Sequence, residues 1–144
     1  MLNGFNNKSL YGVVRKLIVE GKLKTEDKLM DLLQDLKLKK MKQITVHDLL
    51  LHTSGLPNEL DRIHLKKLEP REIVAETLKT KATNKYSRFN CPNLDYYMSG
   101  LIIESVTNIS KKVNVSQRII EPLQLSNTGF SVRNNESNAQ VLGF

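Results

Sequence analysis

The stretch Ile44–Pro57 reads ITVHDLLLHTSGLP, and its order of residue types indicates a short helix with an abrupt end. Thr45 is a good helix cap, because its hydroxyl can accept a hydrogen bond from a free backbone N–H of the first turn. The residues VHDLLLH that follow predict the helix itself, and Gly55 and Pro57 mark where it ends. Taken locally, HTSGLP is a helix stop followed by a turn.

The chain before this stretch has helical periodicity. Apolar residues three and four apart predict an amphipathic helix over about 8–20, and Gly21 fits the position just after its end. Thr25 can cap a second helix, which turns its leucines inward. The basic connector KLKKMKQ, residues 37–43, then leads into Ile44–Pro57.

The chain after it continues in the same way. A helix is expected to begin near Asn58, and Pro70 suits the first turn of another. Asn93 opens the longest apolar helix, and a last helix is expected over 111–120. Turn residues and a short strand are expected over 121–130. Strand alternation is otherwise scarce, so the predicted fold class is mainly α.

Length and composition indicate one globular domain. The chain has 144 residues, of which 40% are hydrophobic and 26% charged. No apolar run approaches the ~18 residues that span a bilayer. The first residues lack the pattern of a signal peptide, so the chain as it stands is expected in the cytoplasm.

The net charge of +7 raises the question of nucleic-acid binding. The basic residues are scattered, with one dense group at 37–42, and the chain has no tryptophan. Because stacking platforms for bases are not evident, the charge is interpreted as a solvated lysine-rich surface, and no nucleic-acid partner is expected.

Histidine spacing does not predict a metal site. His47 and His52 are five residues apart, which places them on different faces of a helix, and His64 stands alone. No glycine-rich phosphate loop occurs, so neither a metal nor a cofactor is expected. Ser54 follows His52 by two residues, but the flanking residues do not form a nucleophile elbow.

Cys91 and Asn93 have local interpretations that leave alternatives open. Pro92 places Cys91, the single cysteine, in extended backbone just before a helix. A helix N-terminus can activate a thiol, yet a lone cysteine is more often a small buried apolar group. Asn93 is typical of an N-cap.

Four motifs together resemble the serine β-lactamase-related hydrolases, which include class C β-lactamases, D-Ala-D-Ala carboxypeptidases and esterase-like enzymes. ITVHDLLLHTSGLP is similar to the family's I-T-x-x-x-L-L-x-H-T-S-G-L-P. The other three segments are VEGKLKTEDKLMDLLQDL at 19–36, FNCPNLDYYMSGLIIESVTNIS at 89–110 and RIIEPLQLSNTGF at 118–130. Their order and spacing agree with those of the family.

The resemblance implies an α/β fold with an inserted helical region, shared with the penicillin-binding proteins. This chain resembles mostly that helical region, with most of the sheet missing. The whole chain, residues 1–144, is thus expected to be a single partial domain, matched over about 8–130.

The family's catalytic positions are carried over from the motifs. Lys8 falls at the lysine of S-x-x-K, which places Phe5 at the serine nucleophile; Ser9 would serve only in a changed register. Cys91 occupies the tyrosine of Y-x-N, and Asn93 its asparagine. The substrate-binding K-T-G or H-x-G motif is not found in the sequence.

These departures predict a truncated or degenerate serine hydrolase that is inactive alone, because acyl transfer needs the nucleophile and the oxyanion hole together. Two alternatives stay open. One is half of a split hydrolase, completed by a protein chain that supplies the missing strands. The other is a helical binding or scaffolding module that associates with itself or a partner through exposed apolar surface.

Overall fold

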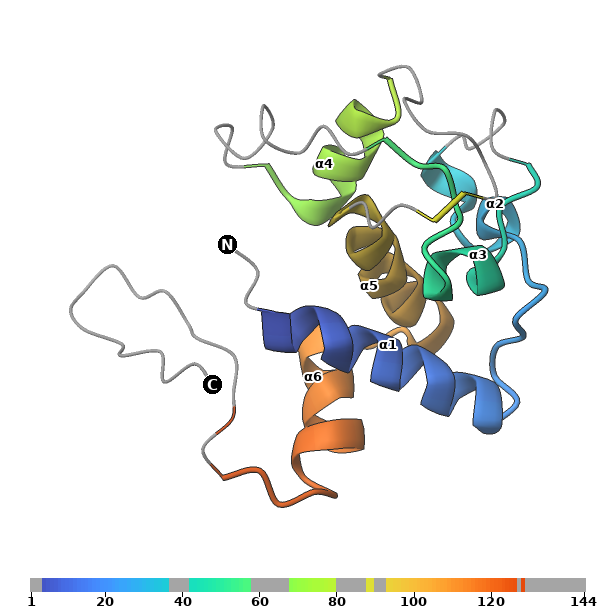
Figure 1. Cartoon of the computed structure of the whole chain (residues 1–144). Coiled ribbons are helices and arrows are strands. Elements are labelled where there is room, and N and C mark those ends of the chain that lie inside the picture. Colours follow the sequence, from blue (N-terminus) through green and yellow to red (C-terminus); the bar gives the residue numbers. More distant parts are fainter. Residues whose placement is uncertain are drawn as a thin grey trace.

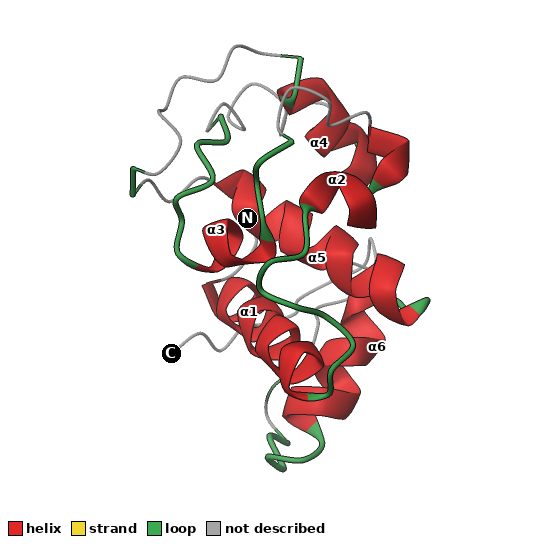
Figure 2. Ribbon diagram, turned by 90° about the vertical axis from the view of Figure 1, so that its right-hand side faces the viewer, coloured by secondary structure: helices red, strands yellow, loops and turns green. Residues whose placement is uncertain are grey.

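The computed structural model describes residues 4–36, 42–57, 68–79, 88–89, 93–126 and 128. Its central element is helix α5, Asn93–Thr107. Five other helices contact α5 from different sides (Figures 1 and 2): α1 Gly4–Val19, α2 Leu29–Leu32, α3 Val46–Leu50, α4 Pro70–Thr77 and α6 Lys111–Val115. The helix predicted near Asn58 lies outside the described residues.

The described part of the chain contains no strand, which confirms a mainly α architecture. Its one isolated β-bridge joins Lys28 to Thr45. Turns occupy residues 121–124 and 126, and no described residue of 121–128 lies in the short strand that was expected there. Within the described ranges, no helix is long and apolar enough to cross a membrane.

Helix α1 starts earlier than the sequence predicts, at Gly4, and ends at Val19 as expected. Gly21 adopts φ +71°, a left-handed conformation that glycine reaches without steric cost, so the predicted stop is confirmed. The apolar stripe of α1 is buried: Leu10, Val13, Val14 and Leu17.

The predicted second helix is wrong in its start and its continuity. The structure has the short α2, Leu29–Leu32, and then a separate 3₁₀ turn, Gln34–Leu36. Thr25 does not cap a helix, because residues 25–29 pair with residues 44–47, at the start of α3, instead. In that pairing the N–H of Leu29 donates to Ile44 O at 3.0 Å, and the N–H of His47 donates to Thr25 O at 2.9 Å.

The cap of α3 is confirmed in detail. Thr45 Oγ1 accepts from the N–H of Asp48 at 3.3 Å, while the Asp48 carboxylate accepts from the N–H of Thr45 at 2.9 Å. This reciprocal pair is a capping box. In α4, Pro70 occupies the first turn as predicted, and Ile73 and Val74 are buried.

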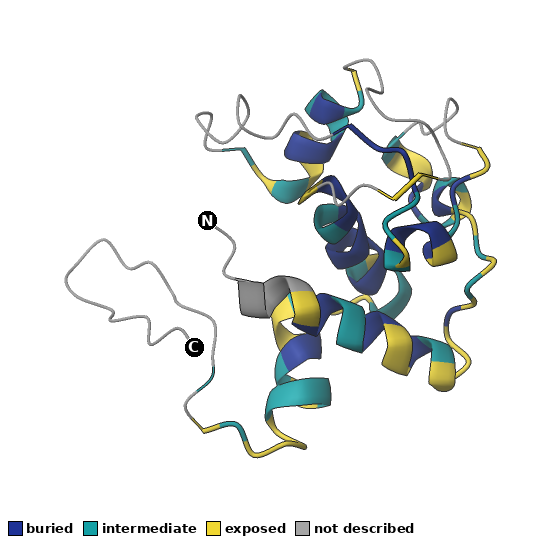
Figure 3. Cartoon of the chain, in the orientation of Figure 1, coloured by how far each residue is buried: buried dark blue, intermediate teal, exposed yellow. Residues whose placement is uncertain are grey.

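The core lies along α5. This helix spans 15 residues, one fewer than α1, and Figure 3 shows buried residues along much of its length. Five of its apolar side chains are at most 2% exposed: Leu94, Met98, Leu101, Ile102 and Ile103. The predicted last helix consists of α6, capped by Ser110, and a π-helical turn, Ser116–Ile120.

Candidate functional site

The turn that follows α3 carries the residues HTSGLP, and it is tightly packed. His52 adopts φ +57° and Gly55 φ +69°, so both lie in the left-handed region and reverse the chain after the helix. The four residues from Ser54 to Pro57 are buried. Within the turn, the N–H of Leu56 donates to Ser54 Oγ at 3.2 Å. We call residues 52–57 the HTSGLP turn.

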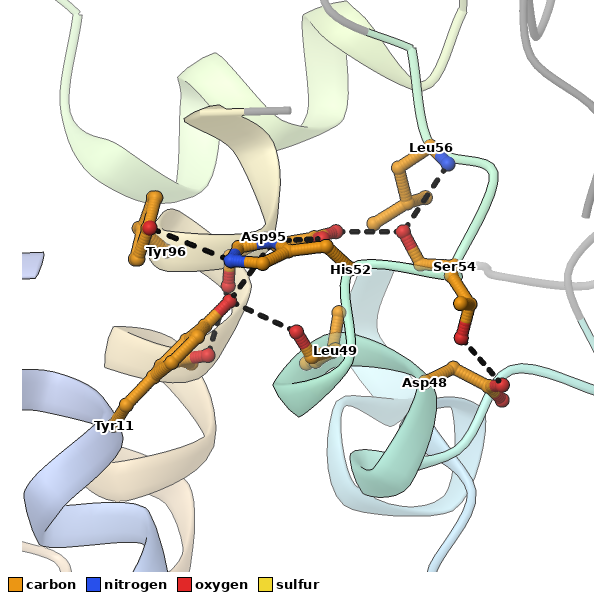
Figure 4. A network of polar contacts seen from close by, with 10 residues as sticks. Tyr11, Asp48, Leu49, His52, Ser54, Leu56, Asp95 and Tyr96 are labelled. Carbon is orange, nitrogen blue, oxygen red and sulfur yellow. Dashed lines mark hydrogen bonds and ion pairs between the residues drawn. The ribbon is translucent and has the colours of Figure 1, made fainter. Parts of the chain in front are cut away.

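Asp95, in the first turn of α5, joins this turn to the central helix (Figure 4). Its side chain is fully buried. Ser54 Oγ donates to Asp95 Oδ1 at 2.6 Å, and His52 Nδ1 lies 3.1 Å from Oδ2. Burial raises the pKa of Asp95 to about 7; the hydrogen bond from Ser54 lowers it in part, and the nearby Asp48 carboxylate raises it further.

His52 is enclosed by aromatic rings. Its ring centroid lies 5.4 Å from those of Tyr11 and Tyr96 and 6.0 Å from that of Phe89. Tyr11 of α1 and Tyr96 of α5 stack on each other at 4.9 Å. Only 14% of the His52 side chain is exposed, and this burial lowers the pKa of its imidazole.

The hydroxyl groups around His52 restrict where its protons can lie. Tyr11 donates to Leu49 O at 2.8 Å, so its oxygen can only accept from His52 Nδ1, 3.4 Å away. On the other side of the ring, the Tyr96 hydroxyl lies 3.4 Å from Nε2. A proton between Nδ1 and Asp95 Oδ2 is either an imidazole N–H or a carboxyl O–H. The cluster can therefore bind and release a proton near neutral pH.

The structure describes two of the four predicted site residues in full. Lys8, on α1, and Asn93, the first residue of α5, are both exposed. The backbone of Phe5 falls in the first turn of α1, but its side chain lies outside the described part, as does Cys91. Ser9, the residue of the alternative register, is buried at 7% exposure.

The stacked rings of Tyr11 and Tyr96 indicate where Lys8 and Asn93 lie relative to each other. Lys8 is three residues before Tyr11 on α1, and Asn93 is three residues before Tyr96 on α5. Residues three apart share one side of a helix, so Lys8 and Asn93 lie on the sides of α1 and α5 that meet at this stack. Asp95 follows Asn93 by two residues on α5, and Tyr11 and Tyr96 both contact the His52 ring.

Sequence reasoning missed Asp95. The signal is a carboxylate on the apolar side of a helix: Met98 and Ile102 follow it by three and seven residues, and all three are buried. A buried carboxylate needs hydrogen-bond donors, and the HTSGLP turn supplies them. Among the described residues, no three His, Cys, Asp or Glu side chains are grouped so that they could hold a metal ion.

Comparison with known proteins places these features in a family. A family model described as beta-lactamase matches residues 10–143. The protein named flp from Staphylococcus aureus strains MRSA252 and N315 is 27% identical over 147 residues, covering 96% of this chain and 30% of the relative. The chain therefore spans less than a third of the length of these relatives.

Two solved structures share the fold. A D-stereospecific amidohydrolase from Streptomyces sp. has a TM-score of 0.73 at 20% identity, covering 87% of this chain and 42% of that one. FmtA from Staphylococcus aureus has a TM-score of 0.72 at 23% identity, covering 87% and 35%. Because this chain aligns with less than half of either structure, it corresponds to one part, the helical one, of the larger fold.

Proposed function

This chain belongs to the beta-lactamase family, and on that premise we propose that it is the helical part of a serine hydrolase of that family, degenerate at the nucleophile and inactive in acyl transfer by itself. The observation that carries the proposal is Phe5 at the serine position of S-x-x-K. A phenyl ring has no atom that can attack a carbonyl carbon, so the acyl-enzyme step has no nucleophile at this place.

The other motif positions also support a chain that has lost catalytic activity but has kept the helices that carry the catalytic positions. Lys8 and Asn93 keep the family's residue types, and both are exposed on the sides of α1 and α5 that meet. Cys91 replaces the tyrosine, and its thiol is shorter than a phenol. Catalytic groups act as a unit, so removal of the nucleophile alone removes most of the rate enhancement.

A hydrolysis assay tests this proposal. The purified 144-residue chain is incubated with a chromogenic cephalosporin and with a p-nitrophenyl ester, beside its Ser9→Ala and Cys91→Ala variants. We expect all three proteins to match the buffer rate. Turnover that copurifies with the wild-type chain and disappears in either variant would overturn the proposal, because that side chain would then be a working nucleophile.

A second candidate is half of a split hydrolase. It is favoured by the coverage of the curated relatives, of which this chain spans 30%, and by the retained Lys8 and Asn93. A second chain would supply the strands and the serine. The adjacent reading frames are the test: the proposal expects K-T-G or H-x-G after a strand in one of them, and coexpression of both chains should then give ester hydrolysis. Frames without such a motif would exclude it.

A third candidate is a helical binding module. Two large apolar side chains near the HTSGLP turn favour it, because Phe89 is 76% exposed and Leu51 is 51% exposed. Self-association or partner binding through this surface should weaken in a Phe89→Ser variant, whereas Val19→Ser, at the end of α1 and 88% exposed, should leave it unchanged. Light scattering that finds a monomer at all concentrations in the wild-type chain would contradict self-association.

A further inference from the structure

The HTSGLP turn is held on α5 by side chains that converge on one carboxyl group. Ser54 and His52 contact the two oxygens of Asp95 at 2.6 and 3.1 Å. Both partners lie more than 40 positions before Asp95 in the sequence, so the contacts join separate parts of the fold. Figure 4 shows the histidine ring between this carboxyl group and the Tyr96 hydroxyl.

The electrostatic surroundings of this pair disfavour an unbalanced negative charge. Asp48 faces it from α3, Tyr11 from α1 and Tyr96 from α5, and none of these three side chains is a lysine or an arginine that could balance a negative charge. The Asp95 side chain has no exposed surface through which water could stabilise its charge. With Asp95 ionised and His52 neutral, the pair thus carries a net charge of −1 in a buried place. One further proton, on either group, brings the net charge of the pair to zero.

Backbone strain in the HTSGLP turn also favours detachment of the turn from α5. His52 is a non-glycine residue at φ +57°, a left-handed conformation that is strained and persists only where the surroundings enforce it. The stacked Tyr11 and Tyr96 rings and the contact with Asp95 are what hold the imidazole in place. When the attraction to Asp95 weakens, the strain favours a detached turn.

We propose that His52 and Asp95 form a proton-operated switch, which holds the HTSGLP turn on α5 while the pair carries a shared proton and loosens the turn when this proton is lost. The proton moves between Asp95 Oδ2 and His52 Nδ1 in the closed state and leaves to solvent past the partly exposed imidazole.

Hydrogen exchange of the full chain tests the switch. Protection of the backbone amides of residues 52–57, corrected for intrinsic exchange rates, is measured from pH 5.5 to 8.5. Because the closed turn binds the proton with a pKa of about 7 and an opened carboxyl group binds it far more weakly, protection should fall by up to tenfold per pH unit as the pH rises from 5.5 towards 7. Above about pH 7 it should become constant. In Asp95→Asn, whose amide has the size of the carboxyl group but no charge to gain, the fall of protection between pH 5.5 and 7 should disappear, and only a rise towards pH 6.5 from the lowered pKa of His52 should remain. His47→Gln is the matched control, because His47 is an exposed histidine five positions before His52, and it should behave as wild type.

A second measurement decides the matter if Asp95→Asn does not fold. Carbon-detected NMR of the wild-type chain follows the Asp95 carboxyl carbon and the His52 imidazole through the same titration. The switch predicts that the carboxyl titrates near pH 7, together with the amides of the turn. A carboxyl that titrates below pH 5, or a turn whose protection is the same at pH 5.5 and 8.5, would overturn the proposal.

Discussion

The two halves of α5 are stabilised in different ways. From Met98 to Ile103 the helix buries apolar side chains against its neighbours, while its first turn buries Asp95 and depends on Ser54 and His52. The apolar half gains free energy from any well-shaped neighbour, because the hydrophobic effect has no direction. The polar turn requires particular atoms at particular distances. Removal of one side chain should therefore have different consequences in the two halves.

The largest effect is expected in the apolar half. Ile102 is 1% exposed, so Ile102→Ala leaves a cavity and should lower the free energy of unfolding by about 2–5 kcal/mol. Urea unfolding followed by circular dichroism measures the change at constant pH. The loss should be the same at pH 5.5 and 7.5; a strongly pH-dependent loss would mean that the core and the Asp95 cluster are not separate.

The polar turn should instead make stability depend on pH. Because the pKa of Asp95 is raised from 3.8 to about 7, the folded chain binds a proton more tightly than the unfolded chain within this range. The free energy of unfolding should then fall as pH rises, by about 1.4 kcal/mol per unit at most and about 2 kcal/mol from pH 5 to 7. The lowered pKa of His52 acts in the opposite direction just below pH 6.5 and reduces this fall.

Asp95→Asn reverses the sign of that dependence. Without the carboxyl group only the His52 contribution remains, so stability should rise with pH towards 6.5. Urea midpoints at half-unit pH steps give both curves. Parallel curves for the wild type and the variant would show that the Asp95 carboxyl does not have its pKa near neutrality.

A smaller effect is expected from Ser54→Ala. This change removes the donor to Asp95 Oδ1 and should cost about 1–2 kcal/mol, because one oxygen of the buried carboxyl group then lacks a hydrogen bond. Thr53→Val is the control in the same turn, since its hydroxyl lies 3.4 Å from Asp48 and that bond is weak. Equal losses in the two variants would argue against a special role of the Ser54 contact.

The smallest loss of stability is expected at the N-cap of α3, which lies outside both halves of α5. Thr45→Ala removes one hydrogen bond of the α3 capping box and should cost about 1 kcal/mol. Thr25→Ala is the comparison, because Thr25 was expected to cap a helix and does not, so its loss should be close to zero. Thermal unfolding of the two variants distinguishes the positions.

These contrasts explain how far the sequence predicts the structure. The α3 cap, the stop at Gly21 and the apolar side of α5 follow from neighbours three or four positions away, so local patterns identified them. The pairing of residues 25–29 with residues 44–47, and the contact of His52 with Asp95, join distant parts of the chain. Periodicity contains no information about such partners, which is why Thr25 was misassigned and Asp95 was missed.

In the candidate site, too, local motifs identified some residues, whereas contacts between distant parts of the chain came only from the structure. The motif register supplied Lys8, Phe5, Cys91 and Asn93, and these assignments remain predictions. The structure adds that α1 and α5 meet through Tyr11 and Tyr96, which places the sides bearing Lys8 and Asn93 at one junction. The structure thus shows how α1 and α5 meet at this junction, while the placing of Phe5 at the nucleophile position remains a prediction from the motif.

Covalent labelling tests that central claim most directly. The full chain is incubated with a penicillin and separately with a fluorophosphonate, and its intact mass is measured before and after. The account predicts an unchanged mass with both reagents, because Phe5 offers no nucleophile. A stoichiometric adduct that maps to a serine, Ser9 above all, would contradict it and identify a working acylation site.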